Sequence, residues 1–600
     1  MMKIREVLSE NYSTQELLNF VSELCYFNRI QGSMELEEAS RYIKDVLSED
    51  GQLDAEIKEY NYSKGYGALH PVSGWWVKYG ELRLLKPKKK LLHTYYESRT
   101  LVVAHSPGGD VEGEVVHVGS GEEPKDYKAD VNGKIVLGYG SPYRFYMEAT
   151  KRGAIGVLVY RKVGIVDAVP YRGLFLTPDE AKRAKAPVMA VSRSTAQYLI
   201  RCIEKKLKPR VRMVVDAGYR DEAYIPVVTT TIGKGNEEIH ICAHYCHPAG
   251  TVNDNVSGAA AIIELAISLA RAINKGEIDA PDKHKIRFLW FPEYWGSMAY
   301  LLNEKPNVVF NANLDMIGEK QNITNSTILF IRSPPSLFHP YESIFYYQIR
   351  DGISRALPIM SYTKSIGYRF DLLHYSMGSD HDIYLHFGIP AIMINQWPDE
   401  FYHTDKDTID KFDVSLAKNI AVSTGVASYL ASCKEHDEIL RQYVAAYFLE
   451  YLATEASKTN SKLYRRRLRY LAEELGDKVP EQYRDKHLAA LMKIKRRKRT
   501  IKAKELYQYI GPKGIIITRP LYEKISWAEY KWLNSLILDH SFYRTIIFSL
   551  IPLYMRKAMS IREFIEIIKD EFGISLRLKD VKRIMSILVK AGLAKKIEYK

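Results

Sequence analysis

Residues 240–266 read HICAHYCHPAGTVNDNVSGAAAIIELA, two apolar runs separated by a polar segment. The first run, which ends near Cys246, is predicted to be a β-strand, and in a strand every second side chain lies on the same face. His244 and Cys246 are therefore expected to point the same way at the strand end. The segment NDNVSG then breaks the chain, and the alanine-rich run after it predicts a helix. Asp254 is thus expected in a loop close to a helix N-terminus.

The surrounding block, residues 221–435, alternates buried strands with helices. This alternation predicts an α/β domain with a mainly parallel sheet. Ligands of such sheets gather at the carboxyl ends of the strands. Other polar candidates of this block also lie at or beyond the ends of its strands: Glu293, Asp315, Asp380, His381 and His403. With His244 and Asp254 they form a set of oxygen and nitrogen ligands of the kind that zinc accepts.

Two blocks precede this domain. Residues 1–92 contain apolar residues at helical spacing and are expected to form the first part of the same core. Residues 93–220 turn to short β-branched strands separated by Gly, Asp and Pro, which predicts a β-rich insert.

Composition bounds the class of protein. The chain has 600 residues, 46% of them apolar and 26% charged, which is typical of a folded protein with several domains. The charged N-terminus has no apolar leader, and no apolar run is long enough to predict a membrane span, so we expect a cytoplasmic protein without membrane contact. The five cysteines are scattered and show no C-x-x-C spacing, which disfavours a disulfide framework or a four-cysteine zinc site.

The positive charge is concentrated in one segment. Between positions 457 and 505 there are 17 Lys and Arg against 6 Asp and Glu, an excess of 11 that leaves +3 of the net +14 for the remainder. The densest stretch, KIKRRKRTIKAK at 493–504, lies in a predicted basic helical linker at 436–540. Either a solvated helix face or weak, non-specific nucleic-acid binding accounts for such a charge run.

Residues 541–600 form the last predicted unit. A helix capped by Ser560, a turn at Gly573, a second helix near 578–590, a stop at Gly592 and a short strand are the pattern of a winged helix. Such a fold can enter the DNA major groove or serve in docking and dimerisation. The second helix is mostly apolar and leaves few side chains to read bases. This favours docking, including homo-oligomerisation, over DNA binding.

The ordered motifs resemble a known class of enzymes. H-Y-x at 244, N-D-N-x-S-G at 253, a Glu before G-S at 293, L-D-M-I-G at 314, S-D-H at 379 and Y-H-T-x-x-D-T at 402 resemble the zinc exopeptidases of the bacterial leucyl aminopeptidase and glutamate carboxypeptidase II class. The stretches DVNGKIVLGYG and ATKRGAIGVLVY resemble the protease-associated domain that many of these peptidases carry as an insert. The C-H-P before N-D-N, the P-E before G-S and the C-terminal winged helix resemble an uncharacterised-domain branch of the class.

The resemblance implies roles for individual residues. It makes His244 the first metal ligand, Asp254 the central or bridging ligand, Asp315 a partner of His244 and His403 the ligand of a second site. Asp380, His381 and Tyr402 are assigned to substrate binding.

Two departures leave the metal count open. The class has H-x-D at the first motif, whereas this chain has Cys246 in the carboxylate position, with His247 as the alternative contributor. The class has a Glu-Glu pair at the third motif, one residue acting as general base and the other as ligand, whereas here Pro292 precedes the single Glu293. Both a one-zinc and a two-zinc site fit these residues, and Glu293 is predicted to be the general base if the metal does not hold it.

Zinc with an open coordination position activates water and polarises a carbonyl group. We therefore expect a zinc-dependent aminopeptidase that removes N-terminal residues from peptides. The alternative is a catalytically degenerate binding or regulatory protein that uses the peptidase fold, associated with glycan intermediates or nucleic acid.

Overall fold

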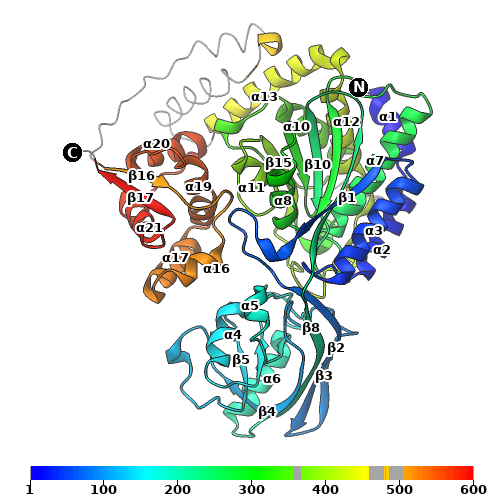
Figure 1. The fold of residues 1–600 in the computed structure, drawn as a ribbon. Coiled ribbons are helices and arrows are strands. Elements are labelled where there is room, and N and C mark those ends of the chain that lie inside the picture. The colour runs from blue at the N-terminus through cyan, green and yellow to red at the C-terminus, as the bar shows by residue number, and fades with distance from the viewer. Residues whose placement is uncertain (1, 356–366, 458–478, 480, 485–504, 599–600) are drawn as a thin grey trace.

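The computed structural model of the chain describes residues 2–355, 367–457, 479, 481–484 and 505–598. Within these ranges the chain forms a large α/β core, a second sheet unit and a C-terminal helical region (Figure 1). The tract at 493–504 lies outside the described residues, so its predicted role in nucleic-acid binding stays a prediction.

The core is built on an eight-stranded sheet in the order β1-β9-β11-β10-β12-β15-β13-β14. Its strands are β1 (Ala55–Asn61), β9 (Tyr224–Ile232), β10 (Glu238–His244), β11 (Lys285–Phe291), β12 (Val308–Leu314), β13 (Thr327–Ile331), β14 (Phe370–Leu373) and β15 (Ala391–Trp397). The four central strands β11, β10, β12 and β15 are mutually parallel, and β9 and β13 flank them antiparallel. The predicted α/β fold with a mainly parallel sheet is therefore confirmed.

Apolar helices cover this sheet. They are α1 (Met2–Asn11), α2 (Thr14–Tyr26), α3 (Met34–Glu49), α7 (Val256–Asn274), α8 (Trp295–Asn303), α9 (Gln321–Thr324), α10 (Tyr341–Arg355), α11 (His381–His386), α12 (Val414–Ser432) and α13 (Asp437–Ser457). Helix α7 packs against β10 and contacts α1, α2, α3 and α12, whereas α8 and α11 contact each other and the sheet. Residues 1–61 thus belong to the core, as predicted.

Helix α7 begins directly after the motif that contains Asp254. The side chain of Asn255 caps it by accepting a hydrogen bond from the Gly258 N–H at 3.1 Å. Within the described ranges, α7 is the one helix whose length and apolarity would suit a membrane span, and 89% of its most apolar 18-residue window is buried inside the fold.

The insert, residues 74–220, carries a seven-stranded sheet in the order β3-β2-β8-β4-β5-β6-β7. Its elements are β2 (Gly74–Lys86), β3 (Lys90–Thr94), β4 (Gly109–His117), β5 (Ile135–Gly138), α4 (Pro142–Thr150), β6 (Gly156–Val159), α5 (Pro178–Ala181), β7 (Val188–Ala190), α6 (Arg193–Glu204) and β8 (Arg210–Arg220). The sheet begins at Gly74 rather than at the predicted position 93, because the long strand β2 pairs antiparallel with β8 along most of its length. Its identity as a protease-associated domain stays a prediction.

The C-terminal region, residues 505–598, contains β16 (Glu505–Tyr509), α16 (Thr518–Glu523), α17 (Trp527–Asp539), α18 (Phe542–Thr545), α19 (Ile551–Tyr554), α20 (Ile561–Phe572), α21 (Leu578–Lys590) and β17 (Ala594–Glu598). The predicted pair of helices is present, with Ser560 capping α20 and Gly573 at a φ of 69° after it. Strand β16 lies within the predicted linker, yet it pairs antiparallel with β17, so this unit draws on chain from both predicted segments. A winged-helix role in docking or oligomerisation stays a prediction.

The C-terminal region also contacts the insert. Lys531 Nζ lies 2.8 Å from Glu123 Oε1, and the Arg144 guanidinium lies 4.7 Å from the centre of the Trp527 ring. Helix α19 contacts α11 of the core. Both appended units therefore lie against the core and against each other (Figure 1).

Candidate metal centre

The central strands deliver polar side chains to one edge of the sheet. His244 is the last residue of β10, Asp315 follows β12 directly, and Glu293 follows β11 after one proline. His403 lies in the loop after β15. Because these neighbouring strands are parallel, their carboxyl ends meet at the same edge, and the residues that follow them come together.

Asp254 lies at the centre of the resulting cluster. Its Oδ1 is 3.3 Å from His244 Nε2, and its Oδ2 is 2.8 Å from His403 Nε2 and 3.5 Å from His247 Nε2. Asp315 Oδ1 is 3.3 Å from the same nitrogen of His244. One carboxylate thus stands between the Nε2 atoms of three histidines.

These residues fall into two groups that could each hold a metal ion. One is His244, Asp254 and Asp315, and the other is His247, Asp254 and His403, and within each group the ligand atoms lie within 4.8 Å of one another. Imidazole nitrogen with carboxylate oxygen is a ligand set that suits zinc. The structure thus brings together all five predicted metal ligands, with Asp254 shared by both groups.

An unsatisfied buried atom supports this interpretation. Asp315 Oδ1 is buried without a hydrogen-bond partner, although His244 Nε2 is close by. An unpaired buried carboxylate oxygen is costly. A cation held between Asp315, His244 and Asp254 would satisfy it, so the residues present fit a bound zinc ion.

The charges of the cluster are strongly coupled. Burial alone would raise the pKa of Asp254, but the charge of His247 and hydrogen bonds from His244 and His403 lower it well below its usual value. Burial lowers the pKa of His247, but Asp254 and Cys246 raise it to about 9. For His403 burial dominates and lowers the pKa to about 4, a value at which the ring is neutral and able to bind a metal at physiological pH.

Cys246 occupies the space where the resembled class has a carboxylate. Its Sγ lies 3.7 Å from Nδ1 of His244 and 3.7 Å from Nδ1 of His247. Burial raises the pKa of this thiol, but the two histidines lower it to about 6. A thiolate that accepts from Nδ1 leaves Nε2 of each ring facing the cluster, as an outer partner of a metal ligand does.

Glu293 lies beside the cluster. Its backbone N–H donates to Cys246 Sγ at 3.2 Å, and its carbonyl oxygen accepts from Gln31 Nε2 at 3.1 Å. Burial raises the pKa of its carboxyl group well above the usual value, against the lowering effect of His244 and His247. The backbone of Glu293 is thus fixed, and its carboxylate belongs to the same electrostatic system as the histidines.

Two of the three residues predicted to bind substrate lie in the interior. Asp380 and His381 are both 0% exposed. Asp380 Oδ1 accepts from the Tyr294 N–H at 2.7 Å and from the Ser297 hydroxyl, and His381 Nε2 lies 3.0 Å from the Ser376 carbonyl oxygen. The strand-end pattern did not reveal that Asp380 points behind the 293–297 turn, where it positions the backbone next to Glu293 instead of contacting a substrate.

Tyr402 is placed differently. Its ring stacks on His403, with ring centres 3.8 Å apart, and it is only partly buried. This position beside a candidate ligand is compatible with the predicted contact to substrate, which stays a prediction.

Several residues that shape the centre were not predicted from the sequence. Asp407 accepts from the backbone N–H groups of Asn253 at 2.8 Å and of Asp254 at 3.1 Å, which fixes the loop that carries Asp254. Tyr171 of the insert packs edge-on against His247 and His403, with ring centres 5.1 and 5.2 Å apart. The D-T pair of the motif after His403 could have indicated Asp407, but no sequence signal connects Tyr171 with this site.

Arg29 holds the loop between β10 and α7 from the N-terminal side. This side chain is 0% exposed. It donates to the carbonyl oxygens of Tyr245 at 2.6 Å, Phe27 at 2.8 Å, Thr251 at 3.4 Å and Pro248 at 3.5 Å, and also to that of Leu24. A single guanidinium therefore joins the end of α2 to the segment that carries His247.

Replacing Arg29 by alanine should destabilise the chain by about 3–5 kcal/mol, because several buried carbonyl oxygens lose their donor at once. Denaturant unfolding of the full chain measures the effect, and zinc content should fall as the loop loosens. Arg41→Ala, a change at an exposed arginine of α3, is the matched control and should leave both values unchanged. An Arg29→Ala protein as stable as the control would show that Arg29 does not hold the loop.

Comparison with known proteins assigns this part of the chain to a class. Residues 227–426 match Peptidase family M28. An aminopeptidase of Pseudomonas aeruginosa strain UCBPP-PA14 is 27% identical over 248 residues, which cover 37% of this chain and 44% of that protein. The match therefore spans less than half the length of this curated relative.

Solved structures share the fold. A Peptidase M28 precursor from Shewanella amazonensis SB2B is 16% identical, with 72% of this chain and 96% of that chain covered and a TM-score of 0.53. BSAP, a zinc aminopeptidase from Bacillus subtilis, is 18% identical, with 71% and 96% covered and a TM-score of 0.50. At these identities the likeness is one of fold.

Proposed function

We propose that this chain is a zinc-dependent aminopeptidase that releases N-terminal residues from peptides. The observation that carries the proposal is the position of the Asp254 carboxylate between His244 and Asp315 on one side and His247 and His403 on the other. The match of residues 227–426 to Peptidase family M28 and the aminopeptidase relative support peptide-bond hydrolysis as the reaction.

The chain offers ligands for one zinc ion at His244, Asp254 and Asp315, and for a second at His247, Asp254 and His403. When bound, zinc lowers the pKa of water from about 15.7 to near 7 and polarises a carbonyl oxygen. Cys246 and Asp407 then act as supports: the thiolate orients the rings of His244 and His247, and Asp407 holds the backbone of Asp254.

Glu293 has the chemistry and the place of a general base. In the proposed reaction its carboxylate accepts a proton from the attacking water and returns it to the leaving amine. Burial and the neighbouring Cys246 and Asp315 favour its protonated form, whereas His244 and His247 oppose it. A positioned base of this kind typically contributes about 10² to 10⁴ in rate.

One observation favours a second candidate, a metal-binding protein of this fold that binds peptides without cleaving them. Pro292 stands where the resembled class has the first of two glutamates, so Glu293 is the only carboxylate at this motif. If a metal ion holds Glu293 as a ligand, the site has no base there.

Hydrolysis of a peptide panel decides between the two candidates. The zinc-loaded full chain should release free amino acid from peptides with a free α-amino group and leave N-acetylated peptides intact. Chelation should stop the release, and added Zn²⁺ should restore it. Internal cleavage products would contradict the exopeptidase assignment, and zinc-replete protein that binds the peptides without releasing amino acid would support the second candidate.

A further inference from the structure

One wall of the candidate site is contributed by the insert. The Val169 N–H donates to Asp405 Oδ1 at 2.9 Å, the Asp405 N–H donates to the Val169 carbonyl oxygen at 3.1 Å, and the Tyr171 N–H donates to the His403 carbonyl oxygen at 2.8 Å. Tyr171 then places its ring against His247 and His403. Residues 169–172 are therefore fixed against the loop that carries a candidate metal ligand.

Two guanidinium groups of the insert lie at this wall. Arg161 Nη1 donates to the carbonyl oxygen of Tyr402, the residue before His403, at 2.9 Å. Arg172 follows Tyr171 directly, and its Nε is buried without a hydrogen-bond partner. Among the described residues, no carboxylate lies within ion-pair distance of either guanidinium, although the charge of Glu122 acts on Arg172.

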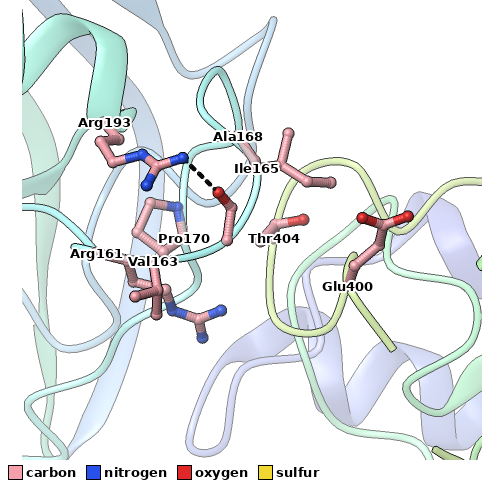
Figure 2. A pocket seen from close by; sticks show the side chains of 9 residues that line it. Arg161, Val163, Ile165, Ala168, Pro170, Arg193, Glu400 and Thr404 are labelled. Atoms are coloured by element: carbon pink, nitrogen blue, oxygen red, sulfur yellow. Dashed lines mark hydrogen bonds between the residues drawn. The ribbon is translucent and has the colours of Figure 1, made fainter. Parts of the chain in front are cut away.

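A cleft opens beside Arg161, with about 280 Å³ of empty space (Figure 2). Arg161 and Arg193 of the insert line it together with Thr404 and the exposed Glu400 of the core. Both Nη atoms of Arg193 are engaged, by the carbonyl oxygens of Lys162 at 2.9 Å and Gly164 at 2.7 Å. The cleft thus has an excess of positive charge next to the loop of His403.

The two guanidiniums disfavour each other in the absence of an anion. Burial, and then the charge of Arg161, lower the pKa of Arg172 to about 10, and burial also lowers the pKa of Arg161. Neighbouring buried cations without acidic partners are costly, and arginine pairs with carboxylates through two parallel hydrogen bonds. An anionic ligand would remove this cost.

We propose that Arg161 and Arg172 form a subsite for a carboxylate of the substrate, so that short peptides bearing a negative charge beyond the scissile bond are the preferred substrates. This inference rests on the proposed aminopeptidase function. Two sources supply the carboxylate: the C-terminus of a dipeptide or tripeptide, or an acidic side chain next to the released residue.

The experiment measures kcat and KM of the zinc-loaded full chain on two matched pairs. Leu-Gly and Leu-Gly-NH2 differ only in the C-terminal charge, and Leu-Glu-NH2 and Leu-Gln-NH2 differ only in the side-chain charge. We expect the charged member of at least one pair to have a KM lower by roughly 10- to 100-fold, as for hydrogen bonds between charged groups. The pair that shows the preference identifies the source of the carboxylate.

An Arg161→Gln, Arg172→Gln double variant should lose this preference by raising the KM of the charged peptide while leaving that of the neutral peptide nearly unchanged. A structural disturbance of the loop would instead affect both members of a pair alike. Arg210→Gln is the matched control, because Arg210 is an exposed arginine of the insert that pairs with Glu112. Equal KM values within both pairs, or a preference that survives in the double variant, would overturn the subsite.

Calorimetric binding of the same peptides to the Glu293→Gln variant separates this inference from the proposed function. If the wild-type chain hydrolyses none of the peptides but the variant binds the charged ones more tightly, the subsite stands and the aminopeptidase assignment fails. If hydrolysis occurs without any dependence on peptide charge, the subsite fails and the aminopeptidase assignment stands. Absence of both hydrolysis and charge-dependent binding overturns both.

Discussion

Asp254→Asn should remove most of the bound zinc and lower peptide hydrolysis by more than about 10³-fold. The carboxylate contacts the Nε2 atoms of His244, His247 and His403, so both candidate ligand groups lose their shared member in one change. A neutral amide has nearly the same size but binds zinc far less well than a carboxylate, and water activation depends on the bound ion. Elemental analysis of the purified variant and amino-acid release from a short peptide measure the two effects.

The matched control is Asp410→Asn, because Asp410 is an exposed aspartate that pairs with Lys411 outside the cluster. It should keep wild-type zinc content and activity. An Asp254→Asn protein with unchanged zinc content would contradict the assignment of Asp254 as the shared ligand. Zinc retained together with lost activity would limit its role to the reaction.

Glu293→Gln should keep the bound zinc and lower kcat by about 10² to 10⁴-fold, the usual contribution of a positioned general base. Glutamine retains the shape of the side chain and leaves the backbone contacts to Cys246 and Gln31 in place, but it cannot accept a proton. Zinc content, kcat and KM of the variant are the measurements, and KM should change little because the lost interaction acts on the transition state.

Joint loss of zinc and activity in Glu293→Gln would show that the carboxylate is a ligand, and the base would then have to be sought elsewhere in the site. Full activity in the variant would remove Glu293 from the reaction. Glu304→Gln, a change at a glutamate just after α8 that contacts Tyr60 at the surface, is the control for an effect of charge alone.

The metal-ligand candidates could be predicted because they follow strands. His244 and Asp315 lie at the ends of apolar runs, and the parallel pairing of β10, β12 and β15 brings those ends together. The same reasoning was insufficient for Asp380 and His381, which also follow a turn in this block but face the interior. Strand-end position indicates that a residue is near the sheet edge, whereas the direction of its side chain depends on turn geometry that the sequence pattern does not specify.

Contacts between distant segments were beyond the reach of the sequence. Arg29 joins the end of α2 to a loop more than 200 residues later, and Tyr171 reaches the histidines from the insert. The insert itself was predicted to start at 93 because its short strands were recognised by composition. Its first strand, β2, has the same alternation as a core strand and is identified only by its pairing with β8.

Anomalous diffraction at the zinc absorption edge, from crystals of the zinc-loaded full chain, tests the central claim most directly. The account predicts an anomalous peak in contact with Asp254 and within ligand distance of His244 and Asp315, of His247 and His403, or of both groups. A fully loaded crystal whose only zinc peaks lie away from Asp254 would contradict the proposed metal centre and the aminopeptidase function built on it.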